Sequence, residues 1–489
     1  MSRHTEPRAI HPLDLPEIET HVAQYLKIGD LVRCVRVNKA WHSSFIPALW
    51  HEVILSPKPK GREHSPSLTS VQKNAYFIRL LSLDSKVKPE YLSISFPNLQ
   101  LLHLTERMTL RGEALANFLT LNNTVTIFEL VTHTKENWTM FSKLENVKRL
   151  DLVDLTVGGT LKADFWRFCT RIEELNLNVV DKTDLMQIPK DTATQAIADN
   201  KLIWFLRRCP NLDTAEFPAE GTENGRSTAL EFVHYISLGT WPKLRGLRFG
   251  SEALKDEDTA KALKSLKQPC YNWGVAFSGF GPKGFAAFRE HFAALERVSL
   301  VDCKNVTSEM IQEIMSSCHL LKTFVAYRVD ARVLGNGPPW VCRQLVSLKV
   351  CIEFITTTES APLDSKEKTR LQRKIFENLS TLRNIESISI GRTASFHEAK
   401  PFLRPTLFRG LELRLEMGLD LLKGLKSLTC FEFQESVQKM TRDEADWIVA
   451  NWVSIETLQG TLNCIDVDIG TQLQNILKKH RIAVINDYI

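Results

Sequence analysis

The sequence contains no long apolar run. No stretch of its 489 residues reaches the roughly 18 consecutive apolar residues that a membrane-spanning helix needs, and the first thirty residues hold no apolar run of signal-peptide length. We therefore expect no membrane partner and a location in the cytoplasm, the nucleus or both. With 43% hydrophobic and 24% charged residues, the composition is typical of a folded protein of several domains or one repeat array.

An excess of one charge is also missing. The chain has 62 lysines and arginines against 57 aspartates and glutamates, which gives a net charge of +5. Proteins that bind nucleic acids usually concentrate basic charge on one face or in one domain. The near balance therefore argues against DNA or RNA as a partner.

Metal and catalytic motifs are absent as well. The ten cysteines are scattered singly, without a Cys-x-x-Cys pair and without histidines at ligand spacing, so we expect buried reduced thiols and no metal. No Gly-x-Ser-x-Gly elbow, Walker loop or His-Glu-x-x-His motif occurs, and the thirteen histidines are dispersed. The sequence therefore predicts a protein that is not an enzyme.

Three short sets of apolar residues with helical spacing lie between residues 11 and 55. A first helix is expected to begin near Pro16 and to carry Ile18, Val22, Tyr25 and Leu26 on one face. Asp30 is expected to cap a second helix, which carries Leu31, Cys34 and Val35. Asn38 is expected to cap a third helix, which carries Trp41 and Phe45 and stops at Pro47.

Three helices in about forty residues make a small core, because so short a chain leaves much of its surface exposed. Some of its large apolar side chains must then be buried against the following domain or against another protein, since an exposed apolar patch usually marks an interaction site.

This N-terminal stretch resembles an F-box. The residues that carry the resemblance are Leu15, Pro16, Glu17, Ile18, Leu26, Asp30, Leu31, Val37, Trp41, Leu49 and Trp50. The opening is one residue shorter than the Leu-Pro-x-Glu-Ile usual in the family. The resemblance implies a Skp-type adaptor as partner and, through it, a cullin scaffold. The implied adaptor-binding residues are Leu15, Pro16, Ile18, Leu31, Val35, Val37 and Trp41.

A second pattern begins after a segment rich in proline, glycine and charge. We assign residues 11–55 to the F-box, 56–75 to a linker or first turn, and 76–489 to a repeat array. In the array an apolar residue, two variable residues, an apolar residue, one variable residue and an apolar residue recur from Ile78-Leu81-Leu83 to Leu428-Phe431-Phe433. The first middle positions are 21, 26, 22 and 25 residues apart.

A period in the twenties is typical of a leucine-rich-repeat solenoid. The last two apolar positions are two residues apart, as in a strand that buries one face, and helical spacing follows them. We therefore expect an α/β fold in which degenerate strand-helix repeats stack into a horseshoe-like solenoid. Returns such as Cys209-Pro210-Asn211-Leu212 resemble the cysteine-containing repeats of fungal-type F-box proteins.

Together the two resemblances imply the substrate-recognition subunit of an SCF-type ubiquitin ligase, with an unknown protein substrate held by the repeats. Side chains that flank the buried strand positions are expected to face this target. The candidates are Arg149, Asp151, Glu174, Asn176, Arg248, Lys349 and Glu432. The first alternative is a leucine-rich-repeat scaffold unconnected to ubiquitin, in which the three helices only cap the solenoid.

The second alternative is a nucleotide-binding enzyme. Residues Gly279 to Gly284 have the G-x-G-x-x-G spacing of dinucleotide-binding loops, between an expected strand at Val275 and Phe277 and a helix from Phe285. Every leucine-rich repeat has the same strand-turn-helix order, however, and Val275 lies 28 residues after Leu247, on the period of the array. We therefore favour an ordinary repeat without a cofactor.

Overall fold

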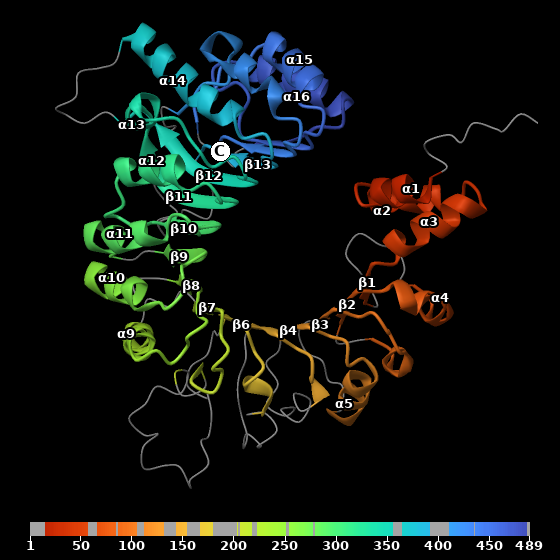
Figure 1. The fold of residues 1–489 in the computed structure, drawn as a ribbon. Coiled ribbons are helices and arrows are strands. Elements are labelled where there is room, and N and C mark those ends of the chain that lie inside the picture. The colour runs from red at the N-terminus through yellow and green to blue at the C-terminus, as the bar shows by residue number, and fades with distance from the viewer. Residues whose placement is uncertain are drawn as a thin grey trace, which may run out of the picture. The chain divides into compact units, whose positions relative to one another are not determined.

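The computed structural model describes residues 15–56, 66–84, 87–104, 112–131, 143–153, 167–178, 203, 206–217, 223–250, 254–276, 279–355, 364–391, 410–434 and 436–486. The chain forms two compact units, Met1–Leu212 and Asp213–Ile489. In each unit, parallel strands pair in chain order, and the described helices between them lie on one side of the sheet (Figure 1). The predicted α/β fold of strand-helix leucine-rich repeats is confirmed.

The first unit begins with three helices and continues as a sheet. Its helices are α1 (Pro16–Ala23), α2 (Ile28–Cys34), α3 (Lys39–Leu49), α4 (Leu68–Asn74) and α5 (Gly112–Leu121), with short 3-10 helices η2 (Ala75–Phe77) and η3 (Pro89–Ser93). Its strands are β1 (Glu52–Leu55), β2 (Leu80–Leu83), β3 (Leu101–Leu104), β4 (Ile127–Val131), β5 (Arg149–Val153) and β6 (Glu174–Asn178).

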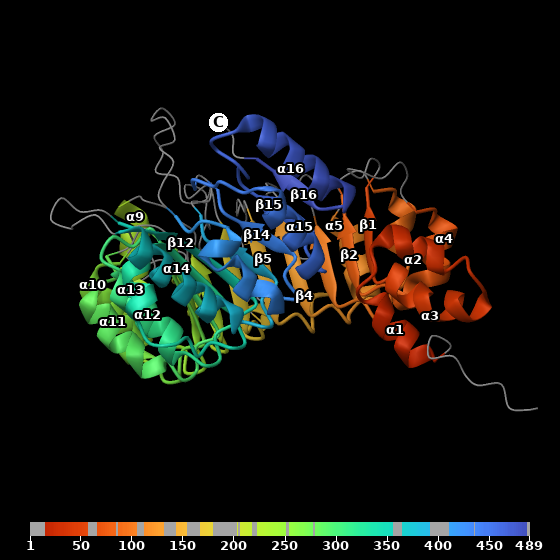
Figure 2. The same ribbon diagram turned by 90° about the horizontal axis from the view of Figure 1, so that it is seen from above.

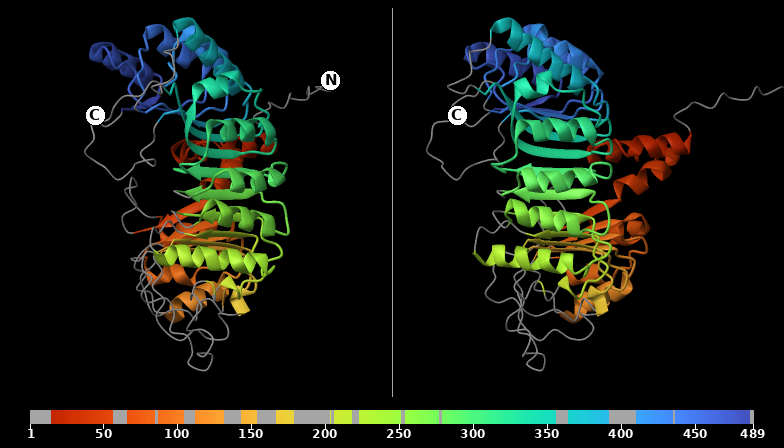
Figure 3. Two further views of the ribbon diagram at one scale, coloured as in Figure 1. Left: turned by 90° about the vertical axis from the view of Figure 1, so that its left-hand side faces the viewer. Right: turned by 60° about the vertical axis from the view of Figure 1, so that its left-hand side comes forward.

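The second unit is a longer array. Its strands are β7 (Thr214–Phe217), β8 (Gly246–Phe249), β9 (Asn272–Ala276), β10 (Arg297–Val301), β11 (Thr323–Asp330), β12 (Ser347–Glu353), β13 (Ser387–Ser389), β14 (Cys430–Glu432), β15 (Thr457–Gln459) and β16 (Ala483–Ile485). Its helices are α9 (Glu223–Ser237), α10 (Asp256–Ser265), α11 (Pro282–Phe288), α12 (Ser308–Ser317), α13 (Ala331–Asn336), α14 (Ser365–Ser380), α15 (Arg442–Asn451) and α16 (Val467–Lys479), with 3-10 helices η6 (Arg289–His291), η8 (Leu415–Met417) and η9 (Leu419–Gly424). Helices α9 to α13 lie in order along one side of its strands (Figure 3).

The middle apolar position of each repeat holds the sheet in register. In the first unit, Leu81 pairs with Leu102, and the row continues through Phe128, Leu150 and Leu175, all of them buried. Alternate residues of a strand point to opposite faces, so one face of every strand packs on the helical side while the other stays open. The second unit repeats this arrangement, with one correction. Trp273, rather than Val275, holds the middle position of β9.

Asparagines fix the turn into several strands of the first unit. Asn98, Asn146 and Asn211 each precede the first apolar residue of a repeat. Their side-chain amides donate to the carbonyl oxygens of Tyr76, Asn123 and Thr170 in the preceding repeat, at 2.8, 2.7 and 2.8 Å. These bonds satisfy loop carbonyls that have no strand partner, so they tie each repeat to its neighbour.

The parallel sheet begins earlier than residue 76, where the sequence pattern places its start. Strand β1 pairs with β2, and helix α4 occupies part of the segment expected to be a linker. Residues 50–55, which the sequence analysis places at the end of the F-box, also fit the repeat pattern through Trp50, Val53 and Leu55, and they include β1. The repeat pattern does not identify β15 and β16, because Gly460 and Asn486 stand where the last apolar residue of the pattern would be.

The three N-terminal helices lie beside α4 and β1 (Figure 2). Asn38 caps α3 as predicted, since its side chain accepts from the Trp41 N–H at 2.8 Å. The predicted cap of α2 was wrong. That helix begins at Ile28 after Lys27, and Asp30 lies in its first turn, bonded to Arg33.

Helix α3 does not stop at Pro47 but runs on to Leu49. The missing N–H of this proline interrupts a single bond near the helix end, and the Trp50 N–H still donates to the Ile46 carbonyl. None of the helices that the structure describes is both long enough and apolar enough to span a bilayer.

A buried histidine ties three elements of the second unit together. His291 Nδ1 accepts from the Cys270 N–H at 3.2 Å, and Nε2 lies 3.3 Å from the Leu263 carbonyl oxygen, so the ring is neutral and protonated at Nε2. Burial lowers the pKa of His291 below its ordinary value. A second proton, on Nδ1, would face an N–H donor.

This histidine predicts a pH-dependent stability. When the pH falls below about 6.5, the ordinary pKa of histidine, His291 takes up a proton in the unfolded chain but not in the folded one. The free energy of unfolding should therefore decrease by up to about 1.4 kcal/mol for each pH unit of acidification, until the pH reaches the pKa of folded His291. His291→Gln should remove this component in urea unfolding between pH 7.5 and 5, whereas His480→Gln, at an exposed position, should keep it. If the free energy of unfolding of His291→Gln depended on pH as strongly as that of the wild type, His291 would not be the source of the pH dependence.

Candidate functional site

The first candidate site is the surface of the three N-terminal helices. Their core consists of Ala23, Leu31 and Phe45. Packed around it are Val22, Leu26, Cys34, Val35, Trp41, Ala48 and Leu49. The ring of Trp41 lies 5.3 Å from that of Phe45, so this tryptophan packs on the core. The core is small, as the length of the segment requires.

The structure separates the predicted adaptor-binding residues into two groups. Leu31 is only 4% exposed and belongs to the core, so its side chain has no surface to offer a partner. Val35 and Trp41 are partly buried against the same core. Leu15, Ile18 and Val37 are exposed, by 38, 37 and 59%. Pro16 is the first residue of α1, and its side chain lies outside the described part of the structure.

Two exposed apolar residues in this region were missed by the sequence reasoning. Tyr25, expected on the buried face of the first helix, is 75% exposed because α1 ends at Ala23 and the following turn points the ring outward. Ile28 opens α2 and is also exposed. Five large apolar side chains are therefore exposed between residues 15 and 37. Single exposed apolar residues are common on protein surfaces, but a group of five in so short a segment indicates an interaction site.

The second candidate site is the open face of the strands in the first unit, where four predicted target-binding residues lie. Arg149 and Asp151 are on β5, and Glu174 and Asn176 are on β6, paired Arg149 with Glu174 and Asp151 with Asn176. The structure therefore brings these four together. Arg149 donates from Nε and Nη2 to Asp151 at 3.1 and 2.8 Å, and its Nε is 3.9 Å from Glu174.

The other three predicted residues lie on the second unit and do not form one cluster. Arg248 on β8 donates to Glu216 at 3.0 Å. The aliphatic part of the Arg248 side chain packs against Gly274, where a Cβ atom would lie only 2.9 Å from Arg248 Cγ. Lys349 is on β12 and Glu432 on β14, so other strands separate each of them from Arg248. They share the open face of that unit without converging on a point.

The glycine loop is occupied by the protein itself. The Asp256 carboxylate at the start of α10 accepts from the backbone N–H groups of Gly281, Lys283 and Gly284 at 2.8, 2.9 and 2.7 Å. These are the N–H groups that would hold a phosphate at the N-terminus of α11. A side-chain carboxylate from the preceding repeat has taken the place of the anion.

The glycines of this loop have a packing role. A Cβ on Gly281 or Gly284 would lie 3.1 or 3.0 Å from the Asp256 carboxylate, so glycine allows the loop to approach it closely. These internal bonds argue against the alternative of a nucleotide-binding enzyme centred on residues 279–284. A bound phosphate would have to displace an internal carboxylate whose three bonds fix the position of α11.

The cysteines are all free thiols, and seven of the ten are buried. Burial raises the pKa of Cys270, Cys318 and Cys342 to about 12, so these thiols stay protonated near neutral pH. A thiol with such a pKa is a poor nucleophile and a poor metal ligand. Within the described ranges, no three of the His, Cys, Asp and Glu side chains are arranged to hold a metal ion.

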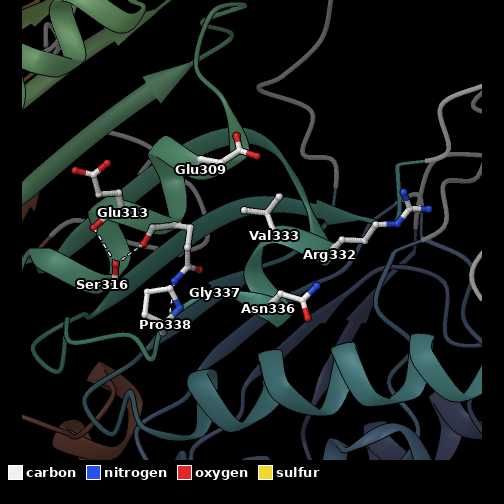
Figure 4. Close-up of a pocket in the computed structure, with 9 residues that line it drawn as sticks. Glu309, Glu313, Ser316, Arg332, Val333, Asn336, Gly337 and Pro338 are labelled. Carbon is white, nitrogen blue, oxygen red and sulfur yellow. Dashed lines mark hydrogen bonds between the residues drawn. The ribbon is translucent and has the colours of Figure 1, made fainter. Parts of the chain in front are cut away.

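One groove was not anticipated. It has a volume of about 520 Å³ and is lined by residues of α12 and of the six-residue helix α13 (Figure 4). Glu309 and Glu313 lie on the α12 side, and Glu313 is already paired with Arg289 at 2.5 Å. Arg332 points away from both glutamates in Figure 4. The charged groups labelled in Figure 4 therefore do not converge on one point of the groove.

Comparisons with known proteins give resemblances of fold only. No protein-family model matches the chain, and no curated protein matches its sequence. Among solved structures, the yeast complex of Rad7 and Elc1 is similar with a TM-score of 0.44 and 10% identity, over 91% of this chain and 87% of that one.

Two bacterial structures are further resemblances. A leucine-rich-repeat protein of Leptospira interrogans has a TM-score of 0.27 and 14% identity over 86% of this chain and 98% of that one. The internalin InlF of Listeria monocytogenes has a TM-score of 0.29 and 11% identity over 86% and 89%. At such scores these resemblances support no conclusion about partners or activity.

Proposed function

We propose that this chain is the substrate-recognition subunit of an SCF-type ubiquitin ligase. Its three N-terminal helices would bind a Skp-type adaptor, and through it a cullin scaffold, while the open strand faces hold a target protein. The observation that carries the proposal is the exposure of Leu15, Ile18, Tyr25, Ile28 and Val37 on a small helical segment whose sequence resembles an F-box. Exposed apolar side chains of this density need a partner.

In this role the chain performs no bond chemistry. Its contribution is to hold the target near the conjugating enzyme, because tethering raises the effective concentration of a target lysine to roughly the millimolar range. The internally filled glycine loop and the protonated buried thiols are consistent with a binding protein.

The proposal is tested by co-purification of the full-length chain with the Skp-type adaptor of its host. Val37→Asp should abolish binding, since a carboxylate buried in an apolar interface without a partner costs several kcal/mol, or about a hundredfold or more in affinity. The matched control is Val453→Asp, which places the same charge at a 71% exposed valine in a turn of the second unit and should bind like the wild type.

The outcomes separate the two remaining functions. Loss of binding in Val37→Asp alone, with an unchanged circular dichroism spectrum, would assign the chain to the ubiquitin system. Absence of binding by the wild-type chain would favour the leucine-rich-repeat scaffold, whose N-terminal helices only cap the sheet at β1.

A further inference from the structure

The open strand face of the first unit presents two rows of side chains in register. Both rows run across β1 to β6, one residue per strand, and alternate with the buried positions. The first row contains Glu52, Leu80, Leu101, Ile127, Arg149 and Glu174. The second contains Ile54, Ser82, His103, Glu129, Asp151 and Asn176. We call these twelve residues the first-unit strand face.

One half of this face is apolar. Leu80, Leu101 and Ile127 are direct neighbours on β2, β3 and β4, and Ile54 on β1 lies opposite Ser82 in the second row. All four are partly exposed. They occupy positions that point away from the buried core of the repeats, where a strand facing water would carry polar residues. This apolar stripe is therefore not explained by the internal packing of the solenoid.

The other half is acidic once its ion pairs are taken into account. Arg149 donates to Asp151 and lies near Glu174. This hydrogen bond to Asp151, together with the charges of Asp151, Glu174 and Glu129, raises the pKa of Arg149. Its single positive charge therefore serves several carboxylates. Strands β4 to β6 carry three carboxylates on this face, those of Glu129, Asp151 and Glu174, against this one guanidinium, so a net negative charge remains.

The accessible carboxylates lie beside the apolar stripe. Glu129 lies two residues after Ile127 on β4, in the second row beside His103. Its side chain is 27% exposed and contacts His103 Nδ1 at 3.1 Å. The Glu174 side chain, at 48% exposed, lies at the far end of the face. Both carboxylates keep surface that a cation can reach.

We propose that the first-unit strand face binds an extended segment of the target protein, with apolar residues at one end and lysine or arginine at the other. The apolar end would lie over Leu80, Leu101 and Ile127, and the basic end over Glu129 and Glu174. This inference rests on the proposed function, because it names the chemistry of the target that the repeats would hold.

The dimensions of the face set the length of the segment. Strands in a sheet are about 4.8 Å apart, so six strands span about 24 Å, which corresponds to about seven residues of extended chain at 3.4 Å per residue. Alternate residues of such a segment point to the same side. Three or four side chains would therefore meet the face, enough for two apolar and two basic contacts.

The test uses the full-length chain and two fluorescein-labelled peptides, Leu-Ser-Ile-Ser-Lys-Ser-Arg and its counterpart with glutamate in place of both basic residues. Binding is measured by fluorescence anisotropy at 50 and 200 mM salt. The wild type should prefer the basic peptide at least tenfold, and more strongly at low salt, because screening weakens exposed charge pairs.

Charge reversal provides the decisive variant. The double substitution Glu129→Lys with Glu174→Lys should reverse the preference, so that the acidic peptide binds at least tenfold tighter than the basic one. The double substitution Asp443→Lys with Asp468→Lys, which adds the same charge at two exposed positions on helices α15 and α16 of the second unit, should leave both affinities within twofold. Leu101→Ser should weaken both peptides, since it shortens the apolar stripe.

An unchanged preference in the double variant, or no binding of either peptide at millimolar concentration, would overturn the proposal. The double variant should co-purify with the adaptor like the wild type, which also confirms that it folds. A chain that fails to bind the adaptor but shows the charge-dependent peptide preference would refute the ubiquitin-ligase function and leave this binding surface standing.

Discussion

Replacing Trp273 by alanine is expected to lower the free energy of unfolding by about 4 kcal/mol, within the range for a fully buried tryptophan. The side chain is completely buried in β9, and its ring lies 6.2, 6.4 and 6.1 Å from the rings of Phe249, Phe280 and Phe288. Phe249 lies on β8 of the preceding repeat, whereas Phe280 and Phe288 lie just before and within α11 of the same repeat. A cavity at this point would loosen the contacts between neighbouring repeats.

The comparison with Trp273→Phe makes this prediction more specific. The Trp273 Nε1–H is buried and has no hydrogen-bond partner among the described residues, so tryptophan itself is costly there. Phenylalanine removes this donor while it keeps an aromatic ring, and we expect a loss of about 1 kcal/mol, far below that of alanine. Equilibrium urea unfolding, followed by circular dichroism, measures the free energy of unfolding of both variants. Equal losses in Trp273→Ala and Trp273→Phe would show that the aromatic packing does not stabilise this site.

Asp256→Ala is expected to lower the free energy of unfolding by about 3 kcal/mol. This is a large effect for one partly exposed aspartate at the start of a helix. Its carboxylate satisfies three backbone N–H groups of the next repeat, those of Gly281, Lys283 and Gly284. An ordinary helix cap satisfies one or two. Without the carboxylate, the loop between β9 and α11 loses its anchor and its N–H groups lie in a partly buried site.

Two variants serve as controls for the Asp256 prediction. Asp256→Asn keeps one acceptor oxygen and should cost less than alanine. Glu257→Ala, at the next position, removes an exposed ion pair with Lys283 and should change the free energy of unfolding far less than Asp256→Ala, because solvent screens exposed pairs. Equal effects of Asp256→Ala and Glu257→Ala in urea unfolding would show that the three bonds do not stabilise the fold.

The open strand face illustrates the limit of reasoning from sequence. The alternation of the strands correctly placed Arg149, Asp151, Glu174 and Asn176 on the open face, because side-chain direction in a strand depends only on position along the chain. Their mixed signs gave no target chemistry. The alignment of Asp151 with Glu129, and of Arg149 with Glu174, depends on the register between strands whose paired residues lie more than twenty positions apart in the chain.

The N-terminal helices illustrate the same division. The cap at Asn38 could be read from the sequence because an N-cap bonds to a residue three positions later in the same segment. Leu31 looked equivalent to Val37 in the sequence, but one is buried and the other exposed. Their difference arises from the packing of α2 against α1 and α3, which local spacing does not specify.

By itself the sequence determined the repeat, the identity of most strands and the positions that face inward, since these follow from apolar periodicity within about twenty-five residues. Only the tertiary structure decided which charges cancel, which apolar side chains remain exposed and what fills the glycine loop. Asp256 and Gly281 are 25 residues apart, and nothing in either segment predicts that they meet. Stacking one repeat on the next creates that contact, and stacking is a property of the folded chain.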